Sequence, residues 1–381
     1  MGREVPAARQ AWRLRLRNWA GPILAAAALF VAAELALRAA GFRYAHHPVA
    51  LRFVRTVADT GARPSRILEG RASAGERTVH IPYALDRDLL WRPLPEQGLT
   101  NSEGFLGPEW SPEKPKGLNR VVALGDSCTV LGDEPYPGVL ARLLSKDGRR
   151  WEVLNAGVAS WSSYQGLRLL EKRLSEYRAD AVTIYFGWND RWLAWAVADK
   201  DLAAHIEKQW KALRWVEESR LLQALQRAAD RLRGPPKLTG SSPRRVSLED
   251  YAANLRAMVS LVRREGGEPV LVTAPTGLTL RHPFTATVGG KTGLGDPARF
   301  VELHDAYNGA VRAAARETGA PLADLDAAFS SMKDHQAVFS DGIHLTREGH
   351  RRAAALLEPA VRHAVEAGRK RERAARLRRE R

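Results

Sequence analysis

The stretch RVVALGDS, residues 120–127, decides the fold expected for this chain. Its apolar part predicts a buried strand, and the glycine allows the backbone to turn sharply where that strand ends. Asp126 and Ser127 then lie at the carboxyl edge of a sheet, where open α/β folds place their sites. A serine hydroxyl attacks only after a base takes its proton. The alternative is a simple turn in which both side chains cap backbone groups.

A candidate base lies far along the chain, in the segment SDGIHL at residues 340–345. Gly342 allows a tight bend, so that Asp341 can fold back on the ring of His344. A carboxylate on one imidazole nitrogen fixes the tautomer and leaves the other nitrogen free to face Ser127. Taken alone, the segment is explained equally well by an aspartate that caps the helix expected from Thr346 and by a surface histidine.

Two further strand ends offer N–H groups for an oxyanion. The run VLN at residues 153–155 is followed at once by Gly157, where a backbone N–H can approach a reacting carbonyl oxygen closely. The run AVTIYF at residues 181–186 leads to Asn189, whose amide can donate a second hydrogen bond. The backbone N–H of Ser127 can donate a third. The alternative is two ordinary turns at strand ends.

These four segments, in this order, resemble the sequence blocks of the SGNH/GDSL hydrolase superfamily. The resemblance implies a nucleophile at Ser127, a general base at His344 and an orienting acid at Asp341. It also implies an oxyanion hole formed by the N–H groups of Ser127 and Gly157 and by the Asn189 side chain.

The resemblance covers residues 101 to 365 approximately, and NSEGFLG at residues 101–107 is similar to a stretch of membrane-anchored bacterial members. Two features depart from the pattern: Cys128 follows the nucleophile, and the usual glycine-rich turn is missing after Thr129. Neither removes a catalytic atom, but both bear on the shape of the acyl pocket.

Strands alternate with helical patterns, which predicts an α/β fold with a sheet covered on both faces. Helix signals are clear between Ser247 and Asp250, which suit a capping box, and Gly266, which ends the helix. We expect a doubly wound, three-layer α/β/α domain of the SGNH or flavodoxin-like kind with a mainly parallel five-stranded sheet. The expected strands include residues 120–124, 153–155, 181–186, 268–273 and 321–325.

The expected organisation has four parts and one insertion. They are a basic segment with an apolar helix (1–41), a small irregular or β-rich region (42–116), the hydrolase domain (117–366) with a helical insertion and linker (191–246), and a basic tail (367–381). The insertion is rich in tryptophan, at positions Trp192, Trp195, Trp210 and Trp215. It is expected to form either a lid over Ser127 or an extra helical hairpin packed on the domain.

The amino terminus predicts a membrane anchor. Trp19–Leu37 is a run of 19 residues with a single charge, Glu34, which can pair with Arg38 one turn on. Arginines ahead of the run favour a cytoplasmic amino terminus, at positions Arg3, Arg9, Arg13, Arg15 and Arg17. The alternatives are a cleaved signal peptide and a buried helix. An uncleaved anchor and a cleaved signal peptide both place the catalytic domain outside the cytoplasm.

Composition excludes some classes of protein. A single cysteine excludes an internal disulfide, and no Cys/His cluster has metal-ligand spacing, so we expect no metal and no cofactor. The net charge of +16 comes in part from residues 369–381, which hold eight Arg or Lys against two Glu. No basic-aromatic nucleic-acid module accompanies it, so nucleic acid is not an expected partner.

We therefore expect a serine esterase of the cell envelope that works through an acyl-enzyme. A polysaccharide O-acyltransferase with the same triad is the first alternative, and a catalytically silent envelope binding module is the second. The expected partners are an acyl-ester substrate, such as an acylated envelope glycan or lipid, and the membrane. Acyl chain length and oligomeric state do not follow from the sequence.

Overall fold

The computed structural model describes residues 7–42, 44, 83–95, 100–132, 134–194, 197–233, 242–278 and 297–379. The chain divides into two compact units. One comprises Met1–His46 with Gln209–Pro235, and the other comprises His47–Lys208 with Pro236–Arg381. We refer to them as the anchor unit and the catalytic unit.

The catalytic unit is built on a parallel five-stranded sheet in the order β4-β3-β5-β6-β7. All five predicted strands are present: β3 (Leu118–Gly125), β4 (Arg150–Gly157), β5 (Ala181–Tyr185), β6 (Glu268–Val272) and β7 (Leu322–Ala323). The three strands β3, β5 and β6 are almost wholly buried, as strands of a parallel sheet covered on both faces must be.

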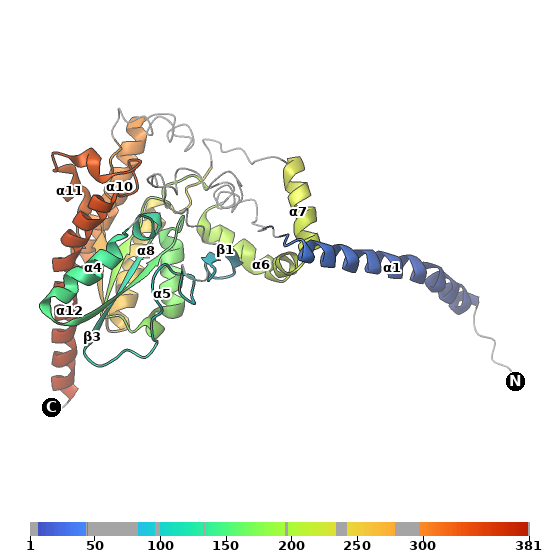
Figure 1. Cartoon of the computed structure of the whole chain (residues 1–381), viewed down its shortest axis with the longest axis horizontal. Helices are drawn as coiled ribbons and strands as arrows, with labels where there is room; N and C mark the ends of the chain where they lie inside the picture. Colours follow the sequence, from blue (N-terminus) through green and yellow to red (C-terminus); the bar gives the residue numbers. More distant parts are fainter. Residues whose placement is uncertain are drawn as a thin grey trace. The chain divides into compact units, whose positions relative to one another are not determined.

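Helices cover both faces of this sheet (Figure 1), which confirms the three-layer architecture. On one face lie α4 (Tyr136–Leu144) and α12 (Arg347–Arg379), whose apolar residues share one buried core with Val121, Ala123 and Val270. On the other lie α5 (Ser163–Tyr177) and α8 (Leu248–Arg264), and α10 (Pro297–Thr318) packs against α8. Shorter elements complete the unit: α3 (Ser127–Val130), η2 (Ser145–Asp147), α11 (Leu325–Ser330) and η3 (His335–Val338).

The strand order determines where a site can form. The chain runs from β3 outward to β4, then returns past β3 to β5 and continues to β7. Open α/β sheets bind ligands beside the carboxyl ends of the strands where this direction reverses. Here that point lies between β3, which leads into Ser127, and β5, which is followed by Asn189. Gly125 is in register with Gly157 of β4 and Tyr185 of β5, so the three strands end level.

Local signals in the sequence are confirmed at α8. The Ser247 side chain accepts the N–H of Asp250 at 3.1 Å and so caps the helix. Gly266, with φ of +87°, follows the last turn. The helix that follows Thr346 is much longer than its apolar pattern predicts. It continues to Arg379, so nearly all of the basic tail is helical.

Two antiparallel strands, β1 (Tyr83–Asp86) and β2 (Leu90–Pro93), form a hairpin in the region predicted to be irregular or β-rich. Residues 45–82 and 96–99 of that region lie outside the described residues. The insertion is helical as expected, with α6 (Asp199–Glu218) and α7 (Arg220–Arg233), while Trp195 and most of the linker lie outside the described residues. The lid stays a prediction, because residues 209–235 belong to the anchor unit.

The anchor unit holds α1 (Ala7–Ala39), whose segment Gly21–Ala39 is long and apolar enough to cross a membrane, with a mean hydropathy of 1.8. The predicted pair is present, with Arg38 Nε 2.7 Å from Glu34 Oε1. The same carboxylate accepts hydrogen bonds from the N–H groups of Arg220 and Leu221, at 3.0 and 2.9 Å. Glu34 of α1 therefore caps the amino terminus of α7.

Two helical glycines test the packing of the catalytic unit. A Cβ on Gly166 of α5 would lie 2.4 Å from the ring of Phe186, whereas a Cβ on Gly309 of α10 meets nothing within 4 Å. Gly166→Ala should lower the free energy of unfolding by about 1–3 kcal/mol through overpacking. Gly309→Ala, the matched control, should raise it by about 0.5–1 kcal/mol through helix propensity. Urea denaturation measures both, and a stabilising Gly166→Ala would contradict the described packing.

Candidate active site

The structure brings together the serine, histidine and aspartate that the sequence singled out. Ser127 Oγ lies 2.9 Å from His344 Nε2, and His344 Nδ1 lies 2.7 Å from Asp341 Oδ2. With Nδ1–H donated to the carboxylate, Nε2 is the nitrogen that accepts the serine proton. Ser127 and His344 are 8% and 6% exposed, so the pair is shielded from water yet reachable. This arrangement can activate a serine for attack on a carbonyl.

The segment before α12 aims the imidazole. Gly342 adopts a φ of +86°, which turns the chain so that Asp341 Oδ1 accepts the N–H groups of Ile343 and His344, at 2.9 and 2.8 Å. Burial by itself would raise the pKa of Asp341, but the hydrogen bond and charge of His344 and these two backbone bonds outweigh it and lower the pKa. The aspartate is thereby kept ionised against the ring.

The serine is set by the end of β3. Asp126 is the N-cap of α3, and its Oδ1 accepts the N–H of Cys128 at 2.9 Å. Gly125 is required here, since a Cβ would lie 2.1 Å from the Thr129 hydroxyl and 2.7 Å from the Tyr185 carbonyl oxygen. Cys128 is buried in the core, and burial raises the pKa of its thiol well above the ordinary value. It is a packing residue beside Ser127.

The three predicted oxyanion donors differ in their hydrogen bonds. Within the described part of the chain the Ser127 N–H has no partner. Asn189 Nδ2 donates to the Trp161 carbonyl at 2.9 Å and to Asp126 Oδ2 at 3.4 Å, so both amide hydrogens have acceptors and the bond to Asp126 is the longer one. The Gly157 N–H already donates to Asn155 Oδ1 at 3.1 Å. Gly157 is needed for packing, because a Cβ would lie 2.8 Å from Thr129 Cβ.

Ser160 is a neighbour that the sequence reasoning missed. The N–H of Trp161 donates to the Val158 carbonyl at 3.1 Å and closes a turn with Ser160 in its third position. Ser160 has a φ of +66°, a conformation that such a turn normally gives to glycine. Its own N–H has no hydrogen-bond partner among the described residues. The Asn189 amide bonds the next carbonyl, that of Trp161, so this turn and Asn189 lie against each other.

A buried ion pair supports this turn. Arg245 donates to both carboxylate oxygens of Asp199, at 3.1 and 2.8 Å, and Nη1 donates to the Ser160 carbonyl at 2.7 Å. Asp199 also accepts the Ser162 hydroxyl at 2.6 Å. Bidentate pairs of this kind are strong and directional. The backbone of Ser160 is therefore fixed from outside the site, by residues of the predicted insertion and linker.

A buried cation, Arg191, lies two residues after Asn189 and was not singled out from the sequence. Its guanidinium carbon is 3.9 Å from the Trp188 ring centroid and 4.4 Å from that of Phe300. Nη1 contacts Nδ1 of His304, whose Nε2 bonds the Ala274 carbonyl at 2.8 Å. Burial lowers the pKa of Arg191 to about 9, and burial with the arginine's charge lowers that of His304. His304 is thus a neutral acceptor rather than a second base.

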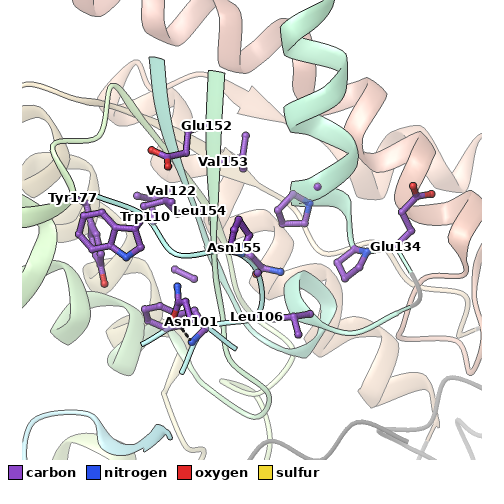
Figure 2. A pocket seen from close by; sticks show the side chains of 17 residues that line it. Asn101, Leu106, Trp110, Val122, Glu134, Glu152, Val153, Leu154, Asn155 and Tyr177 are labelled. Carbon is purple, nitrogen blue, oxygen red and sulfur yellow. Dashed lines mark hydrogen bonds between the residues drawn. The ribbon is translucent and has the colours of Figure 1, made fainter. Parts of the chain in front are cut away.

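No group of three or more His, Cys, Asp or Glu in the described ranges could hold a metal ion. A cavity of about 300 Å³ lies beside strand β4 (Figure 2). Its walls include Phe105, Trp110, Val153 and Asn155, and it excludes Ser127, Asn189 and His344. Asn155, one of the residues that line the cavity, is also the residue whose side chain accepts the Gly157 N–H.

Comparisons with known proteins identify the family. Residues 123–352 match the model of the GDSL-like lipase/acylhydrolase family. A lipase/acylhydrolase from Enterococcus faecalis is similar in structure, with 16% identity, 65% of this chain and 96% of that chain covered, and a TM-score of 0.43. An aryl esterase of M. smegmatis is also similar in structure, with 18% identity, 65% of this chain and 99% of that chain covered, and a TM-score of 0.38. No curated protein matches the chain.

The pH dependence of stability tests the environment of Asp126. Burial raises the pKa of this carboxyl to about 7 from an ordinary 3.8. Between about pH 4 and about pH 7 the folded protein therefore keeps a proton that the unfolded chain has lost, and the free energy of unfolding falls as pH rises. Asp126→Asn removes this titration, so its stability relative to the wild type should rise through that window and level off above it.

Urea denaturation at several pH values measures the difference. Asp190, whose pKa burial raises to about 6, titrates in both proteins and cancels from the comparison. A difference between Asp126→Asn and the wild type that does not change with pH would contradict a buried, protonated Asp126.

Proposed function

Because the chain belongs to the GDSL-like lipase/acylhydrolase family and is a hydrolase that acts on esters, we propose that it is a serine esterase with Ser127 as its nucleophile. The observation that carries the proposal is the continuous relay from Ser127 Oγ through His344 to Asp341, with both hydrogen bonds at 2.9 Å or less. The proposed substrate is an acyl ester of the cell envelope, which is the compartment that the anchor favours.

In the proposed reaction His344 Nε2 takes the proton of Ser127 as Oγ attacks the ester carbonyl. Asp341 stabilises the imidazolium that forms. The tetrahedral intermediate collapses when the C–O bond to the alcohol breaks, and His344 returns the proton to the leaving oxygen. Water then attacks the acyl-serine, with His344 again as the base. Collapse of this second tetrahedral intermediate releases the acid, and His344 returns the proton to Ser127 Oγ. A sugar hydroxyl in place of that water would give acyl transfer instead.

As oxyanion donors we assign the Ser127 N–H, which has no partner among the described residues, and the Asn189 amide hydrogen that donates to Asp126 Oδ2 over 3.4 Å, the longer of that amide's two bonds. A developing oxyanion would replace Asp126 as the acceptor of that hydrogen. For the donor from the loop after β4, the free N–H of Ser160 is favoured over that of Gly157, which is held by Asn155. An oxyanion could recruit Gly157 only if that bond broke. Each donor of this kind typically contributes about 10²–10³ in turnover.

The proposed location is the membrane, with the catalytic unit outside the cytoplasm. Gly21–Ala39 provides a continuous helix of 19 residues, charged only at Glu34 and Arg38, which is close to the length needed to span a bilayer. The arginines ahead of it favour retention of the amino terminus in the cytoplasm. Cleavage of the same segment as a signal peptide would give a secreted enzyme.

Replacement of the nucleophile tests the proposed reaction. Ser127→Ala should lower ester turnover by at least about 10⁴-fold, because nucleophile and base act as a unit. Ser145→Ala is the control: this exposed hydroxyl bonds only the Ala141 carbonyl, and turnover should be unchanged. Product analysis with a panel of acyl esters, with and without added glycan, separates release of free acid from acyl transfer. A purified, folded Ser127→Ala with wild-type turnover would contradict the assignment.

Fractionation tests the location. The full chain should stay with membranes through high salt and alkaline carbonate, and a reporter fused after Arg381 should be active only outside the cytoplasm. Leu24→Arg with Leu29→Arg puts two charges in the apolar span and should release the protein, since each costs about 2.5–3.5 kcal/mol at the centre of a span. Release of the wild type by salt alone would contradict a spanning helix, and a soluble product that begins near Ala40 would show cleavage.

A further inference from the structure

Helix α7 of the anchor unit turns its polar side inward. Gln223 is buried, and its Oε1 accepts the Tyr44 N–H at 2.9 Å. The guanidinium carbon of Arg227 lies 5.7 Å from the ring centroid of Phe42. In a water-soluble helical unit the polar side normally faces solvent. In α7 the polar face, which would normally face solvent, therefore makes these contacts with Tyr44 and Phe42.

The opposite face of α7 is apolar and exposed. Leu225, Ala228 and Leu232 are spaced three and four residues apart, so they form one stripe along the helix. Leu225 is 58% exposed and Leu232 is 89% exposed. Trp215 near the end of α6, in the same unit, is 73% exposed. Large apolar side chains that gather in this way mark an interaction surface.

The charges of α7 suit a membrane surface. The helix carries four arginines and one aspartate, and three of the arginines, Arg220, Arg227 and Arg231, lie away from the leucines. This combination is typical of helices that lie in the interface of a bilayer containing anionic lipids, where a tryptophan is also favoured. A protein partner would have to supply acidic side chains and an apolar groove together, whereas an anionic membrane supplies both phosphates and acyl chains.

The position of α7 relative to α1 points to the same occupant. Glu34 accepts hydrogen bonds from Ser219, Arg220 and Leu221, at 2.9, 3.0 and 2.9 Å, and Arg38 Nη2 donates to the Glu218 carbonyl at 2.8 Å. The first turn of α7 is thus fixed beside the last turns of Gly21–Ala39. Glu34 has its charge satisfied by donors of α7 and by Arg38, as a carboxylate at the edge of hydrocarbon requires.

We propose that α7 lies in the membrane–water interface, with the stripe formed by Leu225, Ala228 and Leu232 against the acyl chains and the exposed Arg231 near lipid phosphates. The inference rests on the proposal that α1 spans the membrane. A span joined to an interfacial helix by a capped turn has a fixed orientation. The membrane would then restrain the insertion as well as the amino terminus.

Spin labels on the full-length protein in vesicles of phosphatidylcholine with a minority of phosphatidylglycerol test the proposal. Cysteines replace Leu225, Leu232, Arg231 and Leu29 one at a time; Arg231 is exposed and lies about 100° around α7 from Leu232, and Leu29 lies within the span. The native Cys128 is 1% exposed and stays unlabelled. At positions 225 and 232, collisions with oxygen should exceed those at 231 several-fold, and collisions with a water-soluble nickel chelate should be several-fold fewer.

Each outcome is decisive. Equal chelate access at 225, 231 and 232, with Leu29→Cys embedded in lipid, overturns the interfacial helix alone. Chelate access at Leu29→Cys as well overturns the spanning helix on which it rests. Low access to both oxygen and chelate at 225 and 232, unchanged when detergent replaces lipid, shows that protein covers the stripe and also overturns the proposal. Esterase activity, assayed on the same samples, reports separately on the proposed function.

Discussion

The hydrogen bond between Ser127 and His344 joins residues 217 positions apart, and the rest of the catalytic unit is arranged to hold it. The serine is placed by β3, which is buried between helices and ends at a glycine that tolerates no side chain. The histidine is placed by the segment before α12. That helix packs in the same core as Val121 and Ala123 of β3, so one sheet positions both the serine and the histidine. Close packing of this core therefore determines the geometry of the site.

Polar contacts refine what the core positions. Asp126 caps α3, and Asp190 accepts the N–H groups of Ser163 and Gly187, at 2.9 and 3.1 Å, so that it joins the turns after β4 and β5. Arg245, paired with Asp199, donates to the Ser160 carbonyl and so fixes that turn. Buried carboxylates and guanidinium groups are expensive unless fully bonded, and removal of one partner leaves the other uncompensated. Mispositioning of the turns after β4 and β5 is therefore costly, so these turns are held in place before any ligand binds.

The sequence predicts the sheet and the relay well, because their signals are local or ordered along the chain. The runs at residues 120–124 and 181–186 are apolar enough to be buried, and Gly342 between Asp341 and His344 allows a tight bend. Other features are not signalled by the residue types involved. The bond that occupies the Gly157 N–H involves a side chain two residues away, and Ser160 takes a conformation that its residue type does not signal. The inverted faces of α7 become visible only when Tyr44 and Glu34 are seen beside it.

The most direct test of the central claim is a map of where a serine-reactive fluorophosphonate binds on the intact protein. The relay predicts one phosphonyl group per chain, carried by the peptide that contains Ser127, because that hydroxyl has a base 2.9 Å away that is itself oriented by a carboxylate. Asp341→Asn should slow the labelling without moving it to another residue. A protein that hydrolyses esters but carries the label elsewhere, or takes none, would contradict the account.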